Sequence, residues 1–303
     1  MSGILTVGLS PAIQQIIRLP GFLPGEVNRS TDYMTDAAGK SINVGRVLVQ
    51  AGIDTHCLVP LGEDNEELFI GLCKRDGLKI RSVRLKGRVR TCYTLIDLEK
   101  KEATEVVVNE PEVISAEEES AFRFEYLRCL DLGLSAVAVS GSRLPGFSSE
   151  IIPFMVKEAL ARGIPFFADY KGEDLLNSFI SDQVRPDFVK INDEELADSF
   201  PEMENIDLAE KILKLSRKYN NSFIITRGGR STFYADSESA GELESQIVDA
   251  VSPIGCGDSF LAGLLEGVVK KLSLAESIEK GRQYAAWNAE SYHPGWIKEG
   301  LRK

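Results

Sequence analysis

Short apolar runs alternate with amphipathic segments along most of the chain. The apolar runs predict buried strands at 4–9, 136–140, 165–168, 188–191 and 223–226. The segments between them have apolar residues at three- and four-residue spacing, which predicts helices at 41–51, 116–130, 150–161 and 208–219. Strands that alternate with helices in this way are typical of an α/β fold with a mainly parallel central sheet covered on both faces.

The last third of the chain and one internal segment depart from this alternation. Residues 258–272 and 274–292 predict two consecutive long helices. Residues 91–97 and 104–109 are β-rich and are joined by a polar segment, which predicts an antiparallel hairpin. No interdomain linker separates these parts.

A basic segment precedes the hairpin. Residues 79–90 contain six Lys or Arg residues and no acid. If the segment is one extended strand, its alternate basic residues from Arg84 to Arg90 share a face. They would either protect a sheet edge from pairing, which is the favoured interpretation, or face a small anion.

Composition excludes several classes of function. The chain has 46 acidic and 35 basic residues, and this net charge of −11 argues against general binding to nucleic acids or membrane surfaces. Five Cys without C-x-x-C spacing and only two His argue against a disulfide framework, a zinc ribbon or a Ser-His-Asp relay. A catalytic metal is therefore expected to be a hard cation. Without a signal peptide or an apolar span in this sequence, we expect a cytoplasmic protein.

Two segments nearly match known phosphate motifs. Gly39-Lys40-Ser41 ends like a Walker A loop, but the position required for its first glycine is Met34. Residues 255–260 begin like a dinucleotide fingerprint, but Phe260 occupies the third glycine position. Neither standard motif is present.

The segment 255–258 still indicates a site, because its glycines lie where an amphipathic helix begins. Amide groups at a helix start bind anions, and glycine lets a phosphate approach the backbone closely. Asp258 has two interpretations that the spacing leaves open. It is either the N-cap of the helix or a general base beside a nest of amides.

At this point the sequence resembles a family. Residues 252–263, SPIGCGDSFLAG, resemble the second signature of the ribokinase-like, or phosphofructokinase B, sugar kinases, and residues 38–48, AGKSINVGRVL, resemble the first. Further segments resemble family motifs in the family's order: LSPAI (9–13), GEVNR (25–29), KGRVRTC (86–92), VNEP (108–111), SGSRLPG (140–146), DYKGEDL (169–175), VKINDEEL (189–196) and TRGGRS (226–231). GEVNR, the Arg90 region and residues 288–290 are typical of the branch that holds 1-phosphofructokinases and tagatose-6-phosphate kinases.

The resemblance implies a three-layer α/β/α ribokinase-like fold and phosphorylation of a sugar hydroxyl with ATP and Mg²⁺. Asp258 would be the general base, and the amides of Gly255, Cys256 and Gly257 would form the anion hole. Asn192 and Glu195 would order Mg²⁺ through water, although Asn192 could equally be a helix N-cap. The nucleotide would contact Lys190, Thr226, Gly228, Ser231 and Asn288.

The same resemblance implies a sugar site beneath a small β lid. The lid would comprise 12–35 and 87–111, over a catalytic domain formed by 1–11, 36–86 and 112–303. The sugar would contact Gln14, Gly39, Lys40, Asn43, Arg90 and Ser140. Gln14 replaces the family's Asp, and Ala38 and Ser41 replace glycines, so these positions leave the acceptor open.

Fructose 1-phosphate is the favoured acceptor, giving fructose 1,6-bisphosphate. The alternatives are tagatose 6-phosphate, another sugar or a nucleoside, or a regulator that binds a sugar phosphate without turnover. The expected partners are a sugar phosphate and ATP, with no nucleic acid and no membrane, and a homodimer through the lid remains open.

Overall fold

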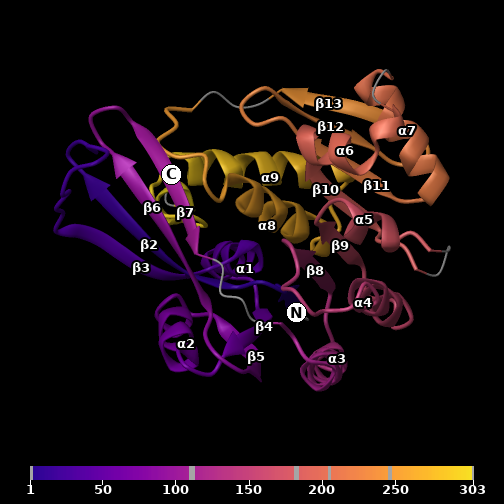
Figure 1. Cartoon of the computed structure of the whole chain (residues 1–303). Helices are drawn as coiled ribbons and strands as arrows, with labels where there is room; N and C mark the ends of the chain where they lie inside the picture. Colours follow the sequence, from indigo (N-terminus) through magenta and orange to yellow (C-terminus); the bar gives the residue numbers. More distant parts are fainter. Residues whose placement is uncertain (1–2, 109–112, 181–183, 204–205, 245–247, 302–303) are drawn as a thin grey trace.

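The computed structural model describes residues 3–108, 113–180, 184–203, 206–244 and 248–301, and its main feature is a nine-stranded sheet (Figure 1). The strands lie in the order β13-β12-β11-β10-β9-β8-β1-β4-β5. Those from β11 to β5 are all parallel, and β12 and β13 add an antiparallel edge. Their bounds are β1 (Ile4–Val7), β4 (Thr55–Gly62), β5 (Lys79–Leu85), β8 (Ala136–Ser140), β9 (Phe166–Asp169), β10 (Phe188–Asn192), β11 (Ser222–Thr226), β12 (Ser231–Ala235) and β13 (Ala240–Glu244).

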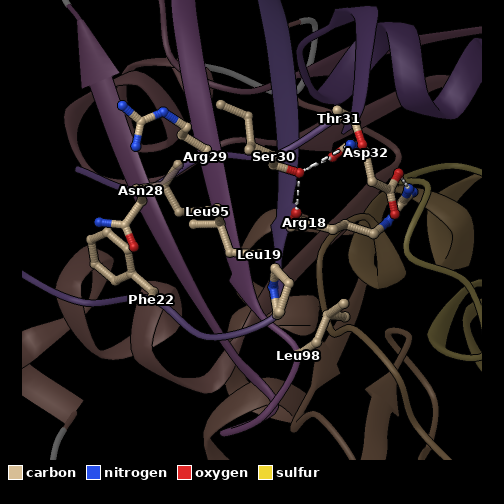
Figure 2. A pocket seen from close by; sticks show the side chains of 12 residues that line it. Arg18, Leu19, Phe22, Asn28, Arg29, Ser30, Thr31, Asp32, Leu95 and Leu98 are labelled. Atoms are coloured by element: carbon tan, nitrogen blue, oxygen red, sulfur yellow. Dashed lines mark hydrogen bonds and ion pairs between the residues drawn. The ribbon is translucent and has the colours of Figure 1, made fainter. Parts of the chain in front are cut away.

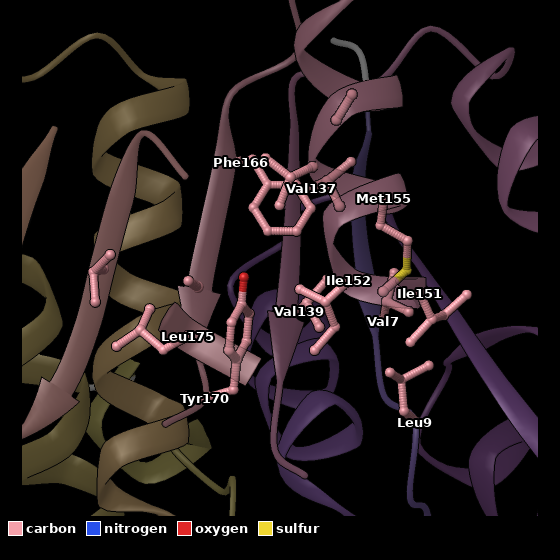
Figure 3. Close-up of a cluster of buried hydrophobic side chains, with 14 of the residues drawn as sticks. Val7, Leu9, Val137, Val139, Ile151, Ile152, Met155, Phe166, Tyr170 and Leu175 are labelled. Atoms are coloured by element: carbon pink, nitrogen blue, oxygen red, sulfur yellow. The ribbon is translucent and has the colours of Figure 1, made fainter. Parts of the chain in front are cut away.

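Helices cover both faces of this sheet, because the buried strands alternate between two apolar faces. In β8, Val137 and Val139 pack against one helical layer, and Ala136 and Ala138 pack against the other. Figure 3 shows the first side, where the side chains of Val137 and Val139 lie beside Phe166 and the helix that carries Met155. Three layers of the expected α/β/α type result.

The helices divide between the layers as follows. One layer contains α1 (Lys40–Gln50), α8 (Cys256–Val269) and α9 (Leu274–Ala289), with α2 (Glu66–Arg75) beside α1. The other contains α3 (Ala116–Leu130), α4 (Ile151–Leu160), α5 (Glu173–Asn177), α6 (Asp193–Ser199) and α7 (Leu208–Tyr219). Two short helices, η1 (Pro201–Met203) and α10 (Lys298–Leu301), complete the set. None of the helices in the described ranges is long and apolar enough to cross a bilayer.

A second, four-stranded sheet projects from the first (Figure 1). Its order is β3-β2-β6-β7, with bounds β2 (Ala12–Leu19), β3 (Asp32–Ala38), β6 (Arg90–Asp97) and β7 (Glu102–Val108). The predicted antiparallel hairpin is confirmed as β6–β7. We refer to this sheet as the lid. The last residues assigned to it from sequence, 109–111, lie outside the described residues, and so does most of the VNEP segment.

The basic segment 79–90 is not one extended strand, so the prediction of a shared basic face is wrong. Its first part is β5, the edge strand of the large sheet, and the chain then passes into the lid at Arg90. Arg84 on β5 forms an ion pair with Glu66 at 2.7 Å, and Lys79 forms one with Asp54 at 2.6 Å. The edge-strand interpretation is therefore confirmed for β5.

Candidate active site

Polar side chains end four neighbouring strands of the large sheet. Ser140, Asp169, Asn192 and Thr226 are the last residues of β8, β9, β10 and β11. The register pairs Ser140 with Asp169 and Asn192 with Thr226. Ligands of open α/β sheets bind outside the carboxyl ends of the strands, so this edge is where a site is expected.

The start of α8 contributes the predicted glycine segment. Gly255 is the N-cap in a left-handed conformation (φ 82°), and no side chain caps the helix. Asp258 lies in the first turn, and its carboxylate accepts a hydrogen bond from Asn43 Nδ2 at 2.7 Å. The N-cap interpretation of Asp258 is therefore wrong. The amide of Cys256, part of the predicted anion hole, donates to the Pro253 carbonyl at 3.3 Å.

Gly255→Ala is expected to destabilise the fold more than a strained backbone alone explains. A Cβ here would lie 2.9 Å from the Gly295 nitrogen and 3.0 Å from Pro294. We expect a loss of about 2–4 kcal/mol in the free energy of unfolding, measured by urea denaturation.

Gly52→Ala is the matched control for this substitution. Gly52 has a similar φ (78°), but nothing lies within 4 Å of its added Cβ, so about 1 kcal/mol is expected. Equal losses in the two variants would contradict the packing argument.

Lysines meet buried carboxylates beside this helix start. Asp169 is fully buried, and its Oδ1 lies 3.3 Å from Lys190 Nζ and 3.6 Å from Lys40 Nζ. Lys40 Nζ also lies 3.3 Å from Glu195 Oε1. The charge of Asp169 raises the pKa of Lys40, which therefore stays protonated. We call Lys40, Asp169, Lys190, Glu195 and Asp258 the charge cluster.

The charge cluster sets the protonation of Asp258. Burial raises the pKa of Asp258 to about 6, and the negative charge of Asp169 acts in the same direction. The hydrogen bond from Asn43 and the charges of Lys190 and Lys40 act against this rise. Asp258 is therefore ionised at pH 7 but far more basic than an ordinary aspartate, which suits a general base.

The predicted metal residues form a capping box at the start of α6. Asn192 Oδ1 accepts from the Glu195 amide at 2.7 Å, and Glu195 Oε2 accepts from the Asn192 amide at 2.9 Å. The capping interpretation of Asn192 is therefore confirmed. Burial acts to raise the pKa of Glu195, but Lys40 and the Asn192 amide hold it below its usual range.

The predicted nucleotide residues divide into two places. Thr226 ends β11 beside Asn192, Ser231 begins β12, and Gly228 lies in the turn between these strands with a φ of 59°. Asn288 is fully buried behind the glycine segment instead. Its amide donates to the carbonyl of Ile254 at 2.8 Å and accepts from the Gly295 amide at 2.6 Å, so it supports the loop before α8.

The predicted sugar residues outside the charge cluster lie around the start of α1, at the end of β8 and in the lid. Gly39 is the N-cap of α1, where an added Cβ would lie 3.3 Å from Pro11, and Ser140 Oγ is buried at the end of β8. Gln14 is buried in β2, and its Nε2 donates to Thr94 Oγ1 at 2.7 Å, so the interpretation in which it faces solvent is wrong. Arg90 donates to the Ser10 carbonyl at 3.3 Å.

A separate pocket of about 890 Å³ opens on the lid (Figure 2). Its lining residues come from the end of β2, residues 28–32 and Leu95 and Leu98, and they include the Arg18–Asp32 ion pair. No residue of the charge cluster lines it. This pocket is therefore not the site of Asp258.

Two residues of the site were missed from sequence. Asp169 follows an apolar run directly, and a carboxylate that ends a buried parallel strand is a signal that could have identified it. Arg46 is buried one helical turn after Asn43 and bonds to its side-chain oxygen. No pattern in the sequence indicates that an arginine in the middle of α1 is buried.

Comparison with known proteins identifies the family. Residues 1–295 match the model of the pfkB family of carbohydrate kinases. The chain belongs to this family. A tagatose-6-phosphate kinase from Staphylococcus epidermidis is 26% identical over 297 residues, which are 97% of this chain and 94% of the relative.

Solved structures show which fold the chain has. Phosphofructokinase-2 from Escherichia coli in complex with potassium gives a TM-score of 0.87 at 20% identity, with 100% of both chains covered. The tetrameric inhibited form of that protein gives 0.85 at 20% identity, again with 100% of each chain covered. The three-layer sheet and the lid are thus the ribokinase-like fold expected from sequence.

Proposed function

We propose that this pfkB-family carbohydrate kinase transfers a phosphoryl group from ATP to a hydroxyl of a sugar phosphate. Fructose 1-phosphate is the first acceptor to test, with fructose 1,6-bisphosphate as product. The observation that supports the reaction most directly is Asp258, a buried carboxylate with a raised pKa at the start of α8, with the ammonium of Lys190 nearby.

In this reaction Asp258 accepts the proton of the attacking hydroxyl. Its pKa of about 6 keeps it ionised at neutral pH and makes it a better base than an exposed aspartate. Asn43 Nδ2 donates a hydrogen bond to Oδ2 of this carboxylate, so the other oxygen, Oδ1, accepts the proton of the hydroxyl. Lys190 and the glycine segment then stabilise the negative charge of the transferring group.

The residues present fit ATP phosphates and a divalent cation. A Cβ at Gly257 would lie 3.0 Å from Lys190 Nζ, so glycine keeps the space between the helix start and the ammonium open. Asp169 Oδ2 is buried and, among the described residues, has no hydrogen-bond partner. Asp169 and Glu195 would hold Mg²⁺ together with phosphates and water, and bound Mg²⁺ would neutralise phosphate charge.

The carboxylates of the site also agree with Mg²⁺ that is bound partly by the protein and partly by substrate phosphates. In the part of the chain that the structure describes, no three His, Cys, Asp or Glu side chains group to hold a metal by themselves. Mg²⁺ is usually bound by one or two carboxylates plus substrate phosphates.

ADP release measured with added sugar phosphates, free sugars and nucleosides tests the function. Turnover that depends on a phosphorylated ketohexose supports the proposal, and the best acceptor separates fructose 1-phosphate from tagatose 6-phosphate. Tight binding of a sugar phosphate without ADP release would instead support a non-catalytic regulator, which the replacements at Gln14 and Ala38 motivate.

Gln14→Asp is expected to change which acceptor is preferred. Gln14 is uncharged and both donates and accepts, whereas an aspartate only accepts and so suits sugar hydroxyls. Because Gln14 is buried in the lid beside Thr94, we expect ratios of kcat/KM among acceptors to shift at least about tenfold, or ~1.4 kcal/mol.

Gln15→Asp is the control for charge in the same strand, because Gln15 points to the other face of β2. It should leave the ratios unchanged. If the ratios also stay constant in Gln14→Asp, Gln14 does not select the acceptor, and Ala38 and Ser41 become the positions to examine.

We also propose that the lid pairs with the lid of a second copy. β7 is the edge strand of the lid, and all of its residues are exposed, including Val106, Val107 and Val108. An exposed apolar edge strand favours pairing with another chain. Analytical ultracentrifugation with and without Val107→Lys tests this; a monomeric wild-type chain would contradict it.

A further inference from the structure

Arg46 is one of the largest fully buried side chains of the protein, and it lies within one helical turn of the candidate sugar residue Asn43. Its guanidinium donates to four acceptors in four different segments. These are Asp76 Oδ2 after α2 (2.7 Å), Asn43 Oδ1 in α1 (2.9 Å), the Pro294 carbonyl after α9 (3.0 Å) and the Ala37 carbonyl in β3 (2.6 Å). Arg46 is therefore held from several sides, independently of any ligand.

This arrangement determines which way the Asn43 side chain points. A guanidinium has only donors, so the amide atom that faces it must be the carbonyl oxygen. The amino group of Asn43 must then point the other way, and it donates to Asp258 Oδ2 at 2.7 Å. With the amide reversed, an oxygen would face the carboxylate and an amino group would face the guanidinium, and both contacts would be unfavourable.

We propose that Arg46 is a positioning residue that fixes the amide of Asn43 so that its amino group binds the ionised carboxylate of Asp258. The inference rests on the proposed function, in which Asp258 is the general base. Through Asn43, Arg46 keeps one carboxylate oxygen engaged and leaves the other for the acceptor proton. Asp76 acts one step further away, by holding Arg46 Nε.

The Asn43 contact matters because the charged groups around Asp258 act in opposite directions on its ionisation. Asp169 on β9 repels the ionised carboxylate, whereas Lys190 on β10 and Lys40 on α1 attract it. Cys256, on α8 itself, lies close enough for the charge of Asp258 to act on its thiol. Asn43, on α1, donates a side-chain hydrogen bond to the ionised carboxylate of Asp258, so reversing its amide would favour the protonated carboxyl.

The test follows Asp258 directly and does not depend on turnover. In protein labelled with ¹³C at aspartate carboxyl carbons, the signal missing from Asp258→Asn assigns Asp258, and its pH titration is recorded in Arg46→Lys. A hydrogen bond to a charged group contributes about 1.5 kcal/mol, so we expect the midpoint to rise by about one pH unit. The apparent pKa of the acidic limb in the pH profile of kcat should rise with the midpoint. At pH 7, kcat should fall about 10-fold or more.

Two further variants make the result decisive. Asn43→Asp keeps an acceptor for Arg46, but it replaces the donor to Asp258 with a second carboxylate. Both the lost hydrogen bond and the added negative charge should raise the midpoint of the Asp258 titration, by more than one pH unit in total, even if Arg46→Lys does not fold. Arg123→Lys, at a partly buried arginine paired with Glu119 on α3, should leave the titration and the pH profile unchanged.

The outcomes separate this inference from the proposed function. An unchanged Asp258 titration in folded Arg46→Lys or Asn43→Asp overturns the positioning role, even if the wild-type chain is an active kinase. If the midpoint rises in the variants but the wild-type chain phosphorylates no sugar, the result supports the positioning role and contradicts the proposed function instead.

Discussion

Asp258→Asn is expected to lower kcat by roughly 10²–10⁴ while making the folded protein more stable at neutral pH. The amide cannot accept the hydroxyl proton, but it retains an oxygen for the Asn43 amino group. It also removes a buried negative charge beside Asp169. Steady-state kinetics and urea denaturation of the same preparations measure both effects.

The stability change should depend on pH with a definite sign. The pKa of Asp258 is raised from 3.8 to about 6 in the folded chain, so the native state binds the proton more tightly than the unfolded state. The carboxyl therefore favours folding below about pH 4 and loses that contribution as pH rises through about 6. Relative to wild type, Asp258→Asn should gain about 1–3 kcal/mol above pH 7 and much less at pH 4.

Asp198→Asn serves as the control, because this aspartate is exposed and pairs only with Lys171 at 2.7 Å among the ion pairs of the described residues. It should change neither kcat nor the pH dependence of stability appreciably. Near-normal turnover in folded Asp258→Asn would reject the catalytic assignment.

The fold was predictable wherever apolar periodicity is strong. The buried strands β8, β9 and β11 and the helices α3 and α7 were placed within one or two residues. β4 was missed although it lies inside the sheet, because Pro60 interrupts a run that otherwise resembles a strand. β13 was missed because it is the edge strand of the large sheet and its alternating exposed residues give no apolar run. β12, which lies between β11 and β13, was missed because its first two residues, Ser231 and Thr232, are polar.

The residues of the site could be predicted from sequence, but the contacts between them could not. A glycine before a helical pattern identified the start of α8, since that signal is local. The partners of Asp258 are not local, because Asn43 lies 215 positions away in the sequence, and Arg46 connects Asn43 to Asp76 and Pro294. Only the packing of α1 against α8 and of residue 294 against α1 brings these groups together.

Arg90→Met and Lys40→Met are expected to fail in different ways, which separates recognition of the acceptor from the chemistry of transfer. Arg90 lies at the start of β6 in the lid, bonds to the Ser10 carbonyl, and has a buried Nε without a hydrogen-bond partner among the described residues. A guanidinium with free donors suits a phosphate on the acceptor. Arg90→Met should therefore lower kcat/KM for a sugar phosphate by roughly 30–1000-fold, or about 2–4 kcal/mol, and change use of an unphosphorylated sugar little.

Lys40 is predicted from sequence to contact the sugar, as Arg90 is, but its contacts in the structure predict another result for its variant. Its ammonium lies between Asp169 and Glu195 and lowers the pKa of Asp258. Lys40→Met should reduce kcat by a similar factor for both kinds of acceptor, and it should move the acidic limb of the kcat–pH profile to higher pH.

Lys86→Met, at an exposed lysine four residues before Arg90, is the charge-matched control and should behave like wild type. If the loss of activity in Lys40→Met differs between the two kinds of acceptor as strongly as in Arg90→Met, Lys40 binds the acceptor phosphate. If neither variant discriminates, the acceptor phosphate is bound elsewhere, and the lid arginine serves only to join β6 to the Ser10 turn.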